Sequence, residues 1–193
     1  ARPAANLAWP PRPRPRAERP LQPADDTPRQ RADAPVRRPS SPLGRAALVL
    51  MHTRGRSSAM YEEASYADVI GEVTTELLQS MGRAVEAGVA RDQLLVDPGI
   101  GFAKRPPDSY GVLARLGDLA AAVDRPVVAG PSRKSFLRGA AGNRPATERD
   151  WATAPAVTAA VLAGAHVVRV HAVEEMVQVV RAAEEIRKAG TST

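Results

Sequence analysis

The sequence predicts an α/β fold of four βα units over residues 46–193, preceded by a stretch over residues 1–45 that is not expected to fold. Three observations carry this prediction. Short apolar runs alternate with helical patterns from Ala46 onward, polar side chains follow each apolar run, and proline is concentrated ahead of Ala46. Alternating strands and helices are typical of a parallel sheet with right-handed crossover connections.

The four expected strands are short apolar runs, and each is bounded by turn residues. Such runs, which lack the alternation of a half-exposed strand, indicate strands buried on both faces. The spacing predicts helices over about residues 62–88, 108–123, 150–164 and 173–188, with apolar side chains recurring at three- and four-residue steps in the last. The strands are expected at residues 47–51, 94–96, 126–129 and 167–170.

The first 45 residues hold 11 of the 18 prolines. Proline lacks an N–H donor and fixes φ, so this density opposes both helix and sheet. Few apolar side chains are available there to offset the entropy of ordering the chain. We therefore expect a disordered Pro/Arg-rich segment over residues 1–45 and one folded domain over residues 46–193.

The basic charge of the chain belongs to that segment. Residues 1–45 hold ten arginines and four acidic residues, so the other 17 basic and 17 acidic residues balance. The segment has a single aromatic residue, Trp9, and we expect no nucleic-acid partner, although salt-dependent binding by the tail stays open as an alternative. There is no cysteine, which excludes a disulfide scaffold and fits a cytoplasmic protein. No apolar run reaches the roughly 18 residues of a membrane span, so no membrane partner is expected.

Polar or charged side chains follow all four expected strands. In parallel α/β folds, ligands bind at the edge where the carboxyl ends of the strands meet. One such residue, His52, is the weakest candidate, because a lone histidine is more often structural. The coincidence of four strand ends predicts a binding site built from residues 52–54, 97–104, 130–134 and 169–171.

Each candidate side chain has a functional and a structural interpretation. The carboxylate of Asp97 could start a turn before Pro98, or accept paired N–H donors from a heterocycle. Arg133 and Lys134 are expected at a helix start, where cations oppose the helix dipole and call for an anionic or carbonyl-bearing ligand. Arg169 lies inside an apolar strand, so its charge must be paired. It either forms a core ion pair or binds phosphate together with His171, which points to the same side of the strand.

Four motifs resemble those of the dihydropteroate synthases, in order and at suitable spacing. The resemblance covers about residues 46–188, and the Ser-Arg-Lys loop distinguishes it from the related pterin-binding methyltransferases, which stay open as an alternative. The motifs are Leu50-Met-His52, Asp97-Pro-Gly-Ile-Gly-Phe102 with Lys104, Ser132-Arg-Lys-Ser135 and Arg169-Val-His171.

This resemblance implies a TIM (β/α)8 barrel of cytoplasmic folate synthesis, of which residues 46–193 are the C-terminal half. The family joins p-aminobenzoate to hydroxymethyl-dihydropterin pyrophosphate and releases pyrophosphate, with Mg²⁺. Asp97 would hold the pterin ring, Met51 would pack on it, and Lys134 would reach both the pterin and the aminobenzoate pocket. Arg169 and His171 would bind the pyrophosphate and stabilise its leaving charge. Three side chains would border the aminobenzoate site: Phe102, Ser132 and Arg133.

The sequence departs from the family by what precedes Ala46. The four other strands, the mobile substrate loops and the asparagine that holds the metal are missing there, so none of the site residues is expected to ligate Mg²⁺. We therefore favour translation in a wrong reading frame over a genuine tail as the origin of residues 1–45. Half a barrel leaves unpaired strand edges, which favour dimerisation, and the family resemblance implies a homodimer. An active synthase fragment and a catalytically dead half-barrel that binds pterin or phosphate are both consistent with this sequence.

Overall fold

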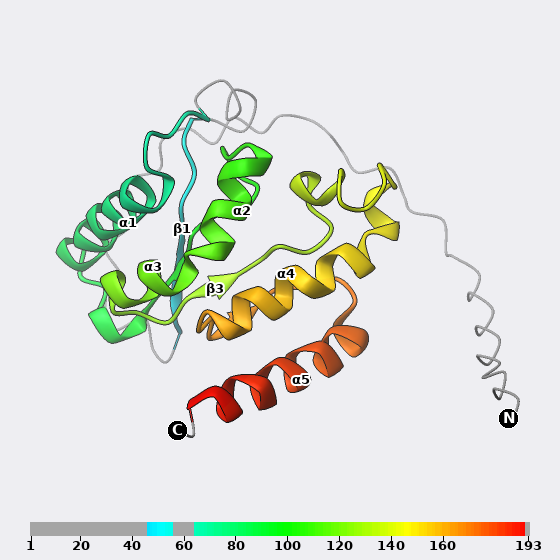
Figure 1. Cartoon of the computed structure of the whole chain (residues 1–193). Helices are drawn as coiled ribbons and strands as arrows, with labels where there is room; N and C mark the ends of the chain where they lie inside the picture. Colours follow the sequence, from blue (N-terminus) through cyan, green and yellow to red (C-terminus); the bar gives the residue numbers. More distant parts are fainter. Residues whose placement is uncertain (1–45, 56–63, 192–193) are drawn as a thin grey trace, which may run out of the picture. The chain divides into compact units, whose positions relative to one another are not determined.

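The computed structural model describes residues 46–55 and 64–191. Strands and helices alternate along them in the predicted order (Figure 1). The predicted disorder of residues 1–45 and the first residues of the first predicted helix lie outside the described part of the chain. The elements are β1 (Leu48–Met51), α1 (Val69–Glu86), β2 (Leu94–Asp97), α2 (Pro106–Ala114), α3 (Leu116–Val123), β3 (Val128–Ala129), α4 (Asp150–Leu162), β4 (Val167–Val168) and α5 (Val173–Thr191), with 3-10 turns at Arg91–Gln93, Ser135–Leu137 and Ala146–Glu148.

The strands are parallel and follow one another in chain order. β1 pairs with β2 from Leu48 opposite Leu94 to Met51 opposite Asp97. β3 pairs with β4, and a parallel bridge between Val96 and Val127 links the two pairs. The carboxyl ends of all four strands therefore meet at one edge, as the sequence pattern predicts for βα units.

Helix α1 begins at Val69, later than the periodicity predicts. The carboxylate of Glu72 accepts the backbone amides of Ala67 and Asp68 at 2.7 and 2.9 Å, which holds the chain in a cap ahead of the helix. An acidic side chain in the first turn also complements the helix dipole. None of the helices in the described residues is long and apolar enough to cross a membrane.

The helix predicted over residues 108–123 is two helices. Arg115 leaves the helical conformation, with φ of −115° and ψ of 23°, and separates α2 from α3. Its guanidinium binds Asp118 in the first turn of α3 at 3.0 Å. The change of direction brings Leu116 and Leu119 into the core, where neither is accessible to solvent.

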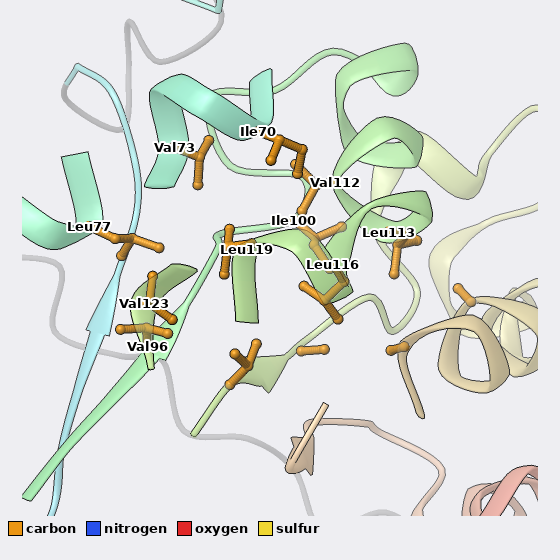
Figure 2. Packing of buried hydrophobic residues seen from close by; sticks show 14 of the residues in the cluster. Ile70, Val73, Leu77, Val96, Ile100, Val112, Leu113, Leu116, Leu119 and Val123 are labelled. Carbon is orange, nitrogen blue, oxygen red and sulfur yellow. The ribbon is translucent and has the colours of Figure 1, made fainter. Parts of the chain in front are cut away.

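The core lies between the helices and one face of the strands. Figure 2 shows Ile70, Val73 and Leu77 of α1 packed with the apolar side chains of α2, α3 and β2. This core is built almost wholly from aliphatic residues, as the aromatic content of 4% requires. A second small cluster joins α4 to α5 through Val157, Val161, Met176 and Ala183.

The opposite face of the strands is apolar and partly open. Leu94 and Val96 of β2 point into the core, so Leu95 points away from it. Together with Val49, Val128 and Val167 it lines a shallow groove that also reaches α5. Val49 and Val167 are 46% and 45% exposed, so the expectation that all four strands are buried on both faces was wrong for β1 and β4.

Candidate active site

Backbone hydrogen bonds draw the strand ends together. The amide of His52, just past β1, donates to the carbonyl of Asp97 at 2.9 Å, and the amide of Arg169, just past β4, donates to the carbonyl of Ala129 at 2.8 Å. Met51, the last residue of β1, is 41% exposed beside this edge. All the candidate side chains named from the sequence lie at or just beyond these strand ends.

Asp97 is a buried acidic residue at the carboxyl ends of the strands. It is 2% exposed, and its Oδ1 accepts a hydrogen bond from the amide of Gly99 at 2.8 Å. Its Oδ2 receives a guanidinium N–H of Arg169 at 3.3 Å. One oxygen therefore orders the turn, as the structural interpretation expects, and the other faces a charged partner of the protein itself.

Arg169 is not inside its strand. β4 ends at Val168, and the Arg169 side chain is 58% exposed, so the expectation of a buried strand charge was wrong. The strand is short because only two residues of β4 pair with β3 before the chain diverges. Gly130 makes room for the guanidinium, since a Cβ there would lie 2.8 Å from Arg169 Nη2. One side of the Asp97–Arg169 ion pair thus stays open to solvent.

Lys134 lies across the loop that follows β2. Its ammonium donates to the carbonyl of Ile100 and sits 4.2 Å from the ring centroid of Phe102. Burial lowers its pKa from 10.5 to about 8, although the charge of Asp97 acts in the opposite direction. Gly101 (φ +78°) allows this approach, since a Cβ would press on the Lys134 side chain.

Arg133 has a different partner from the one expected. It forms a two-pronged ion pair with Asp150, the first residue of α4, at 2.8 and 2.7 Å. This pair raises the pKa of Arg133 and lowers that of Asp150. The expected helix start is a single 3-10 turn at Ser135–Leu137, so the argument from the helix dipole does not apply here. A protein carboxylate neutralises Arg133.

Ser132 and His171 form a second polar pair. The hydroxyl of Ser132 lies 2.9 Å from Nδ1 of His171 and accepts the backbone amide of His171 at 3.2 Å. A neutral imidazole that accepts the hydroxyl proton at Nδ1 carries its own proton on Nε2, as a donor. Ser132 is buried and His171 is exposed. Arg169 and His171 therefore share an edge, but each is held by its own partner.

Comparison with known proteins gives a consistent result. The family model described as "Pterin binding enzyme" matches residues 44–171. The chain belongs to this pterin-binding enzyme family. It is 38% identical over 137 residues to the dihydropteroate synthase of Escherichia coli K12, and 42% identical over 141 residues to that of Mycobacterium leprae; these alignments cover 71% and 70% of the chain. The resemblance that the motifs indicated is confirmed.

Solved structures agree with the sequence relatives. The Yersinia pestis dihydropteroate synthase, determined with a sulfonamide drug complex, superposes with a TM-score of 0.71 at 32% identity, over 74% of this chain and 52% of that one. A Xanthomonas albilineans dihydropteroate synthase was solved with 4-aminobenzoic acid and superposes with a TM-score of 0.67. This pterin-binding enzyme chain spans about half the length of its bacterial relatives, 48% in E. coli and 49% in M. leprae.

Lys104 of this pterin-binding enzyme belongs to the Asp97 motif, but its sequence context gave it no role and did not predict its burial. Lys104 is 1% exposed, and its ammonium lies 2.9 Å from Nδ1 of His52. Nε2 of His52 lies 2.9 Å from Glu76, which Arg54 binds in turn. Burial lowers the pKa of Lys104 to about 7 and that of His52 to about 4. A lysine after a glycine-rich loop carries no sequence sign of burial, so only its partners reveal it.

The described residues do not form a recognisable metal site. Across residues 46–55 and 64–191, no group of three or more His, Cys, Asp or Glu side chains is placed to hold an ion. Mg²⁺ prefers near-octahedral oxygen coordination, and the carboxylates in this part of the chain are not clustered to supply it. The described residues therefore do not fit Mg²⁺.

Proposed function

We propose that the chain carries the pterin-binding half of a dihydropteroate synthase, acting in cytoplasmic folate synthesis. The reaction would join the amine of p-aminobenzoate to the methylene of hydroxymethyl-dihydropterin pyrophosphate. A C–N bond forms, the C–O bond to pyrophosphate breaks, and the amine loses a proton. The main support is the buried carboxylate of Asp97 at the carboxyl edge of parallel strands, next to the half-open cation Arg169.

We propose that Asp97 accepts N–H donors of the pterin ring. A carboxylate held by one amide and one arginine is fixed in place before the ligand arrives, which lowers the entropy cost of binding. Met51, exposed at the end of β1, would cover the ring. Lys134, whose pKa is lowered to about 8, would donate to a pterin ring atom as well as to Ile100.

The leaving group would be received by Arg169 and His171. The exposed guanidinium of Arg169 can turn from Asp97 to the pyrophosphate, and Nε2–H of His171 is available as a donor when Ser132 holds Nδ1. Such donors lower the barrier only if they face the charge that develops in the transition state. Phe102, Ser132 and Arg133 would border the aminobenzoate, with Arg133 acting as the support of its loop because Asp150 holds its charge.

Calorimetry of the full chain with hydroxymethyl-dihydropterin pyrophosphate tests this proposal. Asp97→Asn keeps an oxygen for the Gly99 amide but removes the charge, so we expect the affinity for the pterin ligand to fall about tenfold or more. Asp92→Asn, an exposed carboxylate five residues upstream, is the matched control and should bind like the parent. Equal affinity of all three chains would refute the assignment of Asp97.

A second candidate is a binding-only protein. The observation that favours it is length, because the chain covers only about half of its bacterial relatives and of their structures. Pyrophosphate release that depends on both substrates would support the synthase. Pterin binding without such release would support a catalytically dead pterin- or phosphate-binding half-barrel.

We further propose that the four βα units are half of a (β/α)8 barrel that assembles as a homodimer. Among the described residues β1 pairs with β2 alone and β4 with β3 alone, and Val49 stays 46% exposed in the groove behind the sheet. Sedimentation velocity tests this: Val49→Lys should shift dimer toward monomer. Val85→Lys, a 44% exposed valine on α1, should not, and monomeric parent protein would contradict the dimer.

A further inference from the structure

The loop from Gly99 to Lys104 has a backbone that needs external support. Three of its residues have positive φ: Gly99 at 66°, Gly101 at 78° and Ala103 at 46°. A non-glycine residue such as Ala103 is strained at positive φ, and such a conformation persists only where surrounding contacts enforce it. Tyr66 supplies one such contact, since its hydroxyl donates to the carbonyl of Ala103 at 2.8 Å.

Lys104 supplies the other contacts that support this loop. Its ammonium reaches back to the carbonyls of Gly99 at 3.3 Å and Phe102 at 3.2 Å, within the same loop. Its third contact is Nδ1 of His52, beyond the end of β1. The three N–H donors of one ammonium are thus matched by three acceptors, which is the condition for burying such a group.

The partners of His52 determine which ring nitrogen carries the proton. An ammonium has no acceptor, so Nδ1 must accept, and Nε2 must carry the proton that Glu76 accepts at 2.9 Å. Arg54 holds Glu76 and Glu72, and hydrogen bonding to Arg54 lowers the pKa of Glu76, which is therefore ionised at neutral pH. A continuous chain runs from Arg54 through Glu76 and His52 to Lys104.

We propose that Lys104 is a positioning residue, which holds the loop after β2 against the end of β1 and so sets the place of the pterin contacts. This inference rests on the proposed function. The amide of Gly99 orients the carboxylate of Asp97, and the ring of Phe102 lies under the ammonium of Lys134. Because Lys104 binds the carbonyls of both Gly99 and Phe102, its loss displaces both contacts together.

The protonation state of Lys104 makes the effect dependent on pH. The neutral amine has two N–H donors for three acceptors, so one contact is lost on deprotonation. With a pKa near 7, this change falls close to neutrality. Within residues 46–55 and 64–191, the charged and titratable groups that face Lys104 are His52 and Arg54 after β1, Glu76 on α1, Asp97 on β2, Lys134 after β3, and Tyr66, whose ring centroid lies 5.7 Å away.

The test compares pterin pyrophosphate affinity between about pH 6 and 8.5 in three full-length chains. Lys104→Met keeps the aliphatic stem and removes the donors, and we expect about tenfold weaker binding at pH 6 with a flatter pH profile. Lys134 and the ligand titrate in both chains, so the difference between profiles reports Lys104. Lys188→Met, on the exposed face of α5, should match the parent. Identical affinity and profile in Lys104→Met and the parent would overturn the proposal.

Magnetic resonance of the ligand-free parent chain keeps the test independent of the proposed function and of any misfolding of the variant. We expect the ¹⁵N shift of His52 Nδ1 and the carbonyl ¹³C shifts of Gly99 and Phe102 to move together, with a midpoint near pH 7. If the parent binds no pterin, the function fails while these shifts still report the lysine contacts. Shifts that stay constant from pH 6 to 8.5 would refute the pH dependence assigned to Lys104.

Discussion

At Gly99 the backbone that follows β2 lies close to the backbone that follows β1. Its φ is +66°, and a Cβ at this position would collide with the carbonyl oxygen of His52. The same contact region contains the hydrogen bond from the amide of His52 to the carbonyl of Asp97. Gly99→Ala therefore imposes two costs, one from the backbone conformation and one from the collision.

A matched glycine separates these costs. Gly142 has nearly the same φ, +64°, but nothing lies within 4 Å of its ideal Cβ. Gly142→Ala should lower the free energy of unfolding by about 1–2 kcal/mol, the usual cost of a left-handed non-glycine residue. Gly99→Ala adds forced displacement of packed backbone, which typically costs about 1–3 kcal/mol more. The effect of alanine on the unfolded chain is common to both variants and cancels.

Urea denaturation followed by far-UV circular dichroism measures both losses. We expect Gly99→Ala to lose about 2–5 kcal/mol, and its pterin affinity to fall because the Asp97 carboxylate moves with the Gly99 amide. Equal losses for the two variants would show that the two strand ends do not meet at Gly99, and the site geometry argued from that contact would be wrong.

Three further predictions concern charge and helix propensity. The pKa of Lys104 is lowered from 10.5 to about 7, so between these values the unfolded chain binds more protons than the folded chain, and the free energy of unfolding rises with pH by at most about 1.4 kcal/mol per unit. Denaturation at pH 7 and 8 should show a smaller rise in Lys104→Met than in the parent chain, because only Lys134, with a pKa of about 8, still contributes. A double-mutant cycle on Arg133 and Asp150 should give a coupling of about 1 kcal/mol that weakens with salt, and zero coupling would contradict the ion pair. Gly82→Ala, on the exposed side of α1 with free space at its Cβ, should raise thermal stability by about 0.5–1 kcal/mol, whereas a loss would indicate an unrecognised contact.

Local sequence patterns were sufficient to predict the order of strands and helices along the chain. Short apolar runs predicted where β1 and β2 lie, but they predicted burial on both faces correctly only for β2, since β1 is largely exposed. Parallel strands end at a common edge, so residues that follow them in sequence must gather there. The motif at Asp97 and the Ser132-Arg133-Lys134 loop indicated the family, which the comparisons confirm.

The sequence did not predict which charged side chains would form ion pairs with one another. Arg133 and Asp150 are 17 positions apart, and nothing local distinguishes this pairing from a ligand-binding arginine. The helix predicted over residues 108–123 continues through Arg115 on periodicity, yet the structure breaks there and buries Leu116 and Leu119. Tertiary contacts outweigh helix propensity, which is worth less than about 1 kcal/mol per residue.

By itself the sequence determined the alternation of strands and helices, the aliphatic core and the edge at which polar side chains collect, because these depend on periodicity and chain direction. Only the tertiary structure decided which charges are buried and which are open. Lys104 is enclosed by acceptors from β1 and its own loop, whereas Arg169 emerges half exposed past a two-residue strand. Burial and pairing depend on residues far away in sequence, so their energies exist only once the chain has folded.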